Sequence, residues 1–154
     1  MRSDNLVILA VTLTVLWLLI NETTITWLAA FWIGDYSISE ALTYATRFYD
    51  LDAYLFSAAV RAPPYLLLFW LVGKQLDGTW WQLEIIFLCG LLAILYVMLT
   101  GYWSYAEPGL LGLRISSTHA IELIWIPVYA AVVGLFVVLA VYAVFKLWTV
   151  FSKR

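Results

Sequence analysis

Residues 123–145 form an apolar run without one charged residue, and this run constrains the fold more than any other feature. At about 1.5 Å per residue, a helix of this length measures about 34 Å, enough to cross a hydrocarbon core of about 30 Å. Trp125 and Trp148 stand near its two ends, and tryptophan favours the interface between membrane and water. The sequence therefore predicts a transmembrane helix over 121–148.

The composition also points to a membrane protein. Of the 154 residues, 65% are hydrophobic and 12% are charged, whereas soluble domains carry about 25% charged residues. We therefore expect one membrane domain over residues 1–154, an all-α integral membrane protein. Only eight residues are Lys or Arg and the net charge is −2, so no basic surface is available for nucleic acid and we expect membrane lipid around the chain.

A first membrane segment is predicted over 6–28. Residues 6–20 are uncharged and resemble the core of a signal peptide, but no small-residue cleavage pattern follows them. We expect an uncleaved helix that leaves the membrane near Asn21. The aromatic stretch 26–34 is too short to cross a membrane alone, so it either extends this helix or lies at the surface.

An amphipathic helix is predicted over 37–50, outside the cytoplasm. Ser37 and Glu40 have the spacing of a capping box, which predicts a helix start at Ser37. Leu42 and Phe48 fall on its apolar face, which we expect to be buried against another chain or against this chain's own outer loops.

A second membrane segment is predicted over 52–74, with Arg61 and two prolines at 63 and 64 in its middle. One interpretation is a broken spanning helix, in which Arg61 lies inside the bundle and finds an acidic or carbonyl partner. The other, which we favour as the simpler, ends one helix before Pro63, starts another there, and lets Arg61 reach the headgroups.

A third segment is predicted over 80–101, because tryptophans precede it and tyrosines follow it. Glu84 lies one turn inside this segment, and residues 102–118, with a proline and two glycines, are expected to form a loop. The chain therefore predicts a small bundle of about four transmembrane segments, 6–28, 52–74, 80–101 and 121–148.

The positive charges predict the orientation. With four crossings, five Lys or Arg residues (Arg2, Lys74, Lys146, Lys153, Arg154) fall on one side and three (Arg47, Arg61, Arg114) on the other. Because Lys and Arg near helix ends favour the cytoplasm, we expect both termini to be cytoplasmic, most simply in the cell (inner) membrane.

The chain carries no arrangement typical of an enzyme active site, so we expect a non-enzyme and no metal site. A nucleophile elbow and a glycine-rich phosphate loop are both absent. His119 is the single histidine and the one residue that offers an axial ligand for a haem or chlorin, although an interfacial hydrogen bond is the simpler explanation and the one that we favour.

Small residues in the last segment indicate close helix packing. Ala130 and Gly134 form a small-xxx-small pair, which lets a second helix approach. The pattern does not say whether that helix belongs to this chain or to another.

Three hypotheses for the function follow. The first is a non-catalytic structural or assembly subunit of a larger membrane complex, with other membrane subunits as partners. The second is a small transport or ion-conducting component with a polar path through Arg61, Glu84 and Glu122. The third is a subunit that holds a haem or chlorin through His119.

Overall fold

The computed structural model describes residues 3–47, 50–113 and 119–152, and all regular secondary structure within these ranges is helical. The elements are α1 (Ser3–Leu19), α2 (Glu22–Ile33), α3 (Ile38–Thr46), α4 (Leu51–Trp70), the π-helical turn η1 (Leu71–Gln75), α5 (Trp80–Leu110) and α6 (His119–Phe151). The all-α prediction is confirmed for the described part of the chain.

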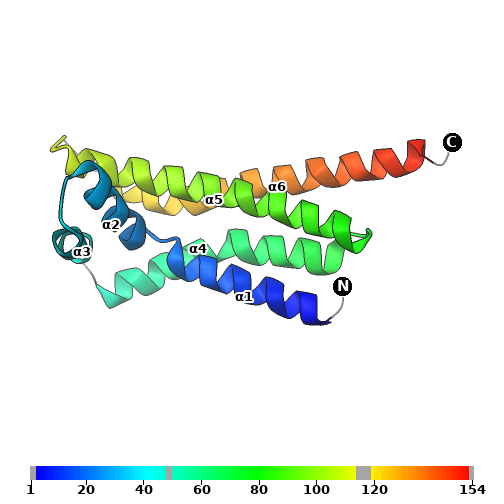
Figure 1. Ribbon diagram of the computed structural model, residues 1–154, viewed down its shortest axis with the longest axis horizontal. Helices are drawn as coiled ribbons and strands as arrows, with labels where there is room; N and C mark the ends of the chain where they lie inside the picture. The colour runs from blue at the N-terminus through cyan, green and yellow to red at the C-terminus, as the bar shows by residue number, and fades with distance from the viewer. Residues whose placement is uncertain (1–2, 48–49, 114–118, 153–154) are drawn as a thin grey trace.

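The helices form an elongated bundle (Figure 1). Helices α1, α4, α5 and α6 run along its length, whereas α3 is seen nearly end-on and so crosses the long axis. Helix α1 begins and α6 ends at the same end of the bundle, which we call the terminal end. The opposite end, called the α3 end, holds α2, α3, the start of α4, the last turns of α5 and the start of α6.

Three helical segments of the bundle are long and apolar enough to cross a membrane: Leu51–Gly73, Trp80–Leu110 and Ile121–Phe151. A fourth is added if the bent pair Leu6–Leu19 and Glu22–Ile33 is counted as one span. The expectation of about four such segments therefore holds at the level of length and composition, with boundaries that differ from the predicted ones.

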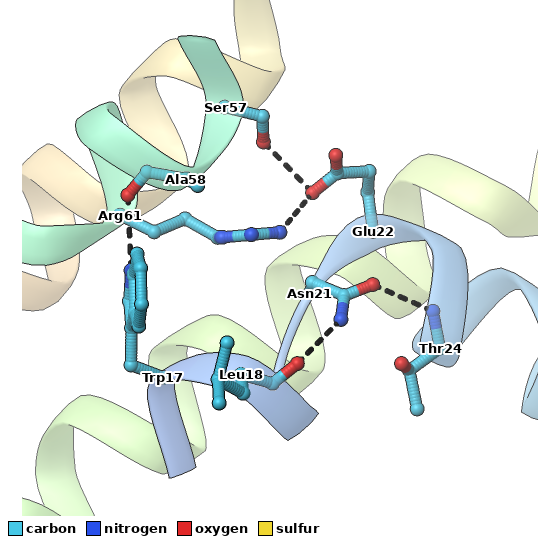
Figure 2. Close-up of polar contacts among 8 residues, drawn as sticks. All are labelled: Trp17, Leu18, Asn21, Glu22, Thr24, Ser57, Ala58 and Arg61. Atoms are coloured by element: carbon cyan, nitrogen blue, oxygen red, sulfur yellow. Dashed lines mark hydrogen bonds and ion pairs between the residues drawn. The ribbon is translucent and has the colours of Figure 1, made fainter. Parts of the chain in front are cut away.

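The first predicted segment, 6–28, is not one continuous helix. Helices α1 and α2 meet at an angle of 56°. Asn21 causes the break, because its backbone is extended at the point where α2 begins. Its side-chain oxygen accepts from the Thr24 N–H at 2.8 Å, and its side-chain amide donates to the Leu18 carbonyl at 2.8 Å (Figure 2). One side chain thus ends α1 and begins α2. Residues 26–33 of the aromatic stretch lie in α2, which packs on α5, so they continue the first segment only across the bend at Asn21.

The favoured interpretation of the second segment is wrong, because α4 continues through Pro63 and Pro64 to Trp70. Each proline removes one backbone N–H, which leaves the carbonyls of Ala59 and Val60 without their usual donors. Packing of the helix on both sides of the prolines compensates, since Ala58, Arg61, Pro64, Tyr65 and Leu68 are all buried. Within a bundle, neighbouring helices hold such a helix together.

Helix α5 is longer than predicted, and the expected loop at 102–118 is wrong as far as Leu110. Neither Gly101 nor Pro108 ends the helix. Tyr102 and Ala106 are buried in this extension, where α2 packs against α5. The chain leaves the helix just before Gly112, whose φ of +65° favours glycine. Residues 114–118 lie outside the described ranges.

The core of the bundle is the contact between α5 and α6, and the small residues of α6 serve this contact. Ala130 is fully buried. A Cβ added to Gly134 would lie 2.6 Å from Ile94 Cγ1, and one added to Gly90 would lie 2.5 Å from Val138 Cγ2. The helix that approaches the predicted small-xxx-small pair is therefore α5 of the same chain.

The capping box of α3 is confirmed. The Ser37 N–H donates to Glu40 Oε2 at 2.9 Å, and the Ser37 hydroxyl oxygen accepts from the Glu40 N–H at 3.4 Å. The hydrogen bonds from the Ser37 hydroxyl and then from its backbone N–H lower the pKa of Glu40 below its usual 4.5, so this carboxylate is ionised at neutral pH.

Helix α3 is shorter than the predicted 37–50, and its apolar face is only partly covered. It ends at Thr46. Ala41 is buried, but Ile38 and Leu42 are exposed, so the chain's own outer segments do not cover the predicted face. Phe48 lies outside the described residues.

Candidate functional site

A buried ion pair lies near the α3 end of the bundle. Arg61 Nη1 of α4 lies 2.6 Å from Glu22 Oε2 of α2, and the exposed fractions of the two side chains are 1% and 20%. Arg61 therefore lies inside the bundle and has an acidic partner. A charge with apolar surroundings is costly unless it is paired, and such residues are candidates for function in membrane proteins.

The local sequence explains how the two charges meet. Asn21 turns the chain, so that Glu22 becomes the first residue of α2 and faces α4 (Figure 2). Ser57, one turn before Arg61, donates its hydroxyl to the same oxygen, Glu22 Oε2, at 2.9 Å. The Trp17 indole N–H donates to the Ala58 carbonyl at 2.9 Å and ties the end of α1 to this part of α4. These hydrogen bonds thus connect the kink between α1 and α2 to the middle of α4.

Several polar atoms beside the ion pair have no hydrogen-bond partner among the described residues. They are Arg61 Nε, Arg61 Nη2, and the hydroxyls of Tyr65 and Tyr102, all of them buried. Arg61 also lies over the ring of Tyr54, with Cζ 5.4 Å from the ring centroid, a cation–π contact. Buried polar groups of this kind commonly bind ordered water.

An open cleft of about 500 Å³ adjoins the ion pair. Glu22 and Ser57 line it, and Arg61 lies behind them, one helical turn deeper than Ser57. Its other lining residues come from α2 to α6 and from the segment before α4: Thr23, Thr26, Tyr44, Ala45, Arg47, Asp50, Ala53, Tyr54, Phe56, Val60, Tyr105, Ala106, Gly109, Leu123 and Ile124. The cleft therefore combines carboxylates, one guanidinium, three tyrosines and an apolar wall.

The polar path expected through Arg61, Glu84 and Glu122 is not brought together. Glu84 is exposed in the second turn of α5, about 27 Å along that helix from Tyr102, which interacts electrostatically with both Glu22 and Arg61. Glu122 lies in the first turn of α6 at the α3 end, close enough to Tyr105 for an electrostatic interaction. Between the ion pair and the terminal end lies an apolar layer of Leu68, Leu91, Ile94 and Met98.

Two other candidates have no described side chain. The His119 side chain and the whole of Phe48 lie outside the described part of the chain. The haem or chlorin hypothesis at His119 therefore stays a prediction. Within the part of the chain that the structure describes, no group of three or more His, Cys, Asp or Glu side chains gathers to hold a metal ion.

Glu22 is the residue that sequence reasoning missed. In the sequence it directly follows Asn21, where the first membrane helix is expected to leave the membrane, so it carries no predicted role. A usable signal was present, because Glu22 is an isolated carboxylate between two apolar stretches and Arg61 is an isolated cation within another. Isolated charges in membrane segments usually pair with one another.

No protein-family model, curated protein or solved structure matches this sequence.

Proposed function

We propose that this protein is a non-catalytic integral membrane subunit of a larger protein complex, and that its α3 end binds a partner subunit. The observation that carries the proposal is an uncovered apolar surface on α2 and α3. Trp32, Ile38 and Leu42 have exposed fractions of 79%, 64% and 54%. We call these three residues the α3 patch. Exposed apolar surfaces bordered by polar residues often mark contacts with another protein.

The charges of α3 favour a protein partner over an anionic lipid surface. Helices that lie on membranes are usually rich in Lys and Arg on the polar side. Helix α3 carries Glu40 and, at its C-terminal cap, Arg47, and Asp50 follows shortly after. Anionic headgroups would meet more negative than positive charge there. The apolar surface of the α3 patch is better matched by an apolar surface on another protein.

The long helix α6 supports the same proposal. Only 17% of its most apolar window is buried within the chain, compared with 39% for α4 and for α5. Helix α6 therefore has ample surface for neighbouring helices of other subunits as well as for lipid.

The α3 patch is tested by replacing Ile38 and Leu42 together with serine in the full-length chain. We expect partner subunits that co-purify with the wild-type protein in mild detergent to be lost, because two exposed apolar side chains of α3 are replaced by hydroxyls. Membrane insertion should persist, since α3 lies outside the long apolar segments. The matched control is Leu42→Met, which keeps the apolar surface and should keep the partners. A wild-type protein that purifies without partners, or a double variant that retains them, would contradict the proposal.

We also propose that both termini lie in the cytoplasm. Helix α1 begins and α6 ends at the terminal end of the bundle (Figure 1), and five of the eight Lys and Arg residues are assigned to that side. In a Cys89→Ser background, Ser152→Cys should react with a membrane-impermeant thiol reagent only after the cells are opened. Ser39→Cys, exposed on α3, should react in intact cells. The reverse pattern would overturn this orientation.

A further inference from the structure

The cleft at the α3 end differs from the α3 patch in its chemistry. The patch is apolar, whereas the cleft has a carboxylate and a hydroxyl, those of Glu22 and Ser57, in its lining. Its volume of about 500 Å³ lies within the range of small-molecule sites in proteins. The cleft is therefore expected to bind a different kind of molecule from the one that contacts the α3 patch.

The Glu22 carboxylate is held so that one oxygen remains available. Arg61 and Ser57 both donate to Oε2. No donor among the described residues reaches Oε1, which points away from Arg61 (Figure 2). The side chain is 20% exposed. The hydrogen bonds from Arg61 and Ser57 fix the Glu22 side chain, while its second oxygen can face the cation of a ligand.

The walls beside Glu22 are rich in aromatic rings. Tyr44, Tyr54, Phe56 and Tyr105 line the cleft. Aromatic rings attract organic cations, and sites for quaternary ammonium groups combine several rings around the charge. Tyr54 already has one cation, the Arg61 guanidinium, over its ring. Rings and a carboxylate together favour an ammonium group as the occupant.

The cleft lining also carries one positive charge, that of Arg47, together with a second carboxylate, that of Asp50. Arg47 is exposed and lines both this cleft and a shallower hollow on α3. Val60, Leu123 and Ile124 supply an apolar wall. A ligand with a cation, an anion and an apolar tail would match all three parts, and the anion would bind near the guanidinium.

We propose that this cleft binds a zwitterionic phospholipid, with its ammonium group beside Glu22 and the tyrosines, its phosphate toward Arg47 and its acyl chains along the apolar wall. The position of the cleft also fits a phospholipid, because its lining includes residues near the ends of long apolar helices. If these helices span a bilayer, the cleft lies at the level of the lipid headgroups. Lipid binding in this cleft requires no partner subunit, because all the lining residues belong to this chain.

The test uses the full-length protein in a non-ionic detergent and native mass spectrometry to measure lipid binding. Dioleoyl phosphatidylcholine and dioleoyl phosphatidylethanolamine should bind about tenfold more tightly than dioleoyl phosphatidylglycerol, which has the same acyl chains but no ammonium group. Choline chloride in excess should displace phosphatidylcholine. Equal binding of the three lipids, or no displacement by choline, would overturn the assignment of the ammonium group.

A pair of variants locates the site. Ala53→Trp adds a large side chain to the cleft lining and should weaken phosphatidylcholine binding about tenfold, because it occupies the ligand volume. Ala59→Trp makes the same change at an exposed position of α4 outside the lining and should leave binding unchanged. Tyr44→Leu, which removes one ring, gives a second check if Ala53→Trp does not fold. Unchanged binding in the folded cleft variants would show that the lipid binds elsewhere.

Discussion

Replacing Arg61 with alanine is expected to lower the free energy of unfolding by about 3–5 kcal/mol, the largest effect that we predict for a single side chain. The Arg61 side chain is 99% buried and contacts the Glu22 carboxylate at 2.6 Å. Removing the guanidinium leaves a largely buried carboxylate with Ser57 as its remaining donor. It also removes the cation over Tyr54. Reversible unfolding in mixed micelles, followed by circular dichroism, measures the change.

Three comparison variants isolate the charge from the packing. Glu22→Gln combined with Arg61→Met removes both charges and keeps similar volumes, so it should be much milder than Arg61→Ala. Arg61→Lys keeps the charge and should be partly tolerated. Arg47→Ala removes an exposed arginine of α3 and should cost less than about 1 kcal/mol. An Arg61→Ala protein as stable as the wild type would mean that Arg61 is not inside the bundle.

Gly134→Leu is the second large effect, with an expected loss of at least about 3 kcal/mol of unfolding free energy. Even a Cβ atom at this position would lie 2.6 Å from Cγ1 of Ile94, which is 98% buried. A leucine would force α5 and α6 apart and disrupt the most extensive helix contact among the described residues. The same micelle unfolding experiment measures the loss.

Ala140→Leu is the matched control for Gly134→Leu. It adds bulk to the same helix at an exposed position and should change stability by less than about 0.5 kcal/mol. Ala130→Leu, at the other fully buried small residue, should behave like Gly134→Leu. If Gly134→Leu and Ala140→Leu have equal effects, the small residues of α6 face a surface other than α5.

The helical nature and the approximate number of the apolar segments were accessible from the sequence, although their boundaries were not. A run such as 123–145 forms a helix because its backbone groups need internal hydrogen bonds in apolar surroundings, and this requirement is local. The start of α3 was accessible for the same reason, since Ser37 and Glu40 satisfy each other's backbone within one turn.

Where helices break or continue depended on packing. Pro63, Pro64 and Pro108 stay inside helices, while Asn21, a weaker signal, ends one. A proline inside a helix costs about 3 kcal/mol or more, an amount that burial of neighbouring side chains can offset. The sequence shows the cost but not the neighbours, so the predicted breaks in α4 and α5 were wrong.

The candidate site depended on tertiary structure most of all. The sequence allowed the prediction that Arg61 lies inside the bundle with an acidic partner. It did not identify that partner as Glu22, because Glu22 lies 39 residues away in the chain. The 56° bend at Asn21 turns the start of α2 toward α4 and brings the two charges together. The sequence by itself determined the membrane-type composition, the apolar helices and the capped start of α3, because each follows from residues close along the chain. Only the tertiary structure decided which charges pair and where the cleft forms, because these depend on the packing of helices distant in sequence.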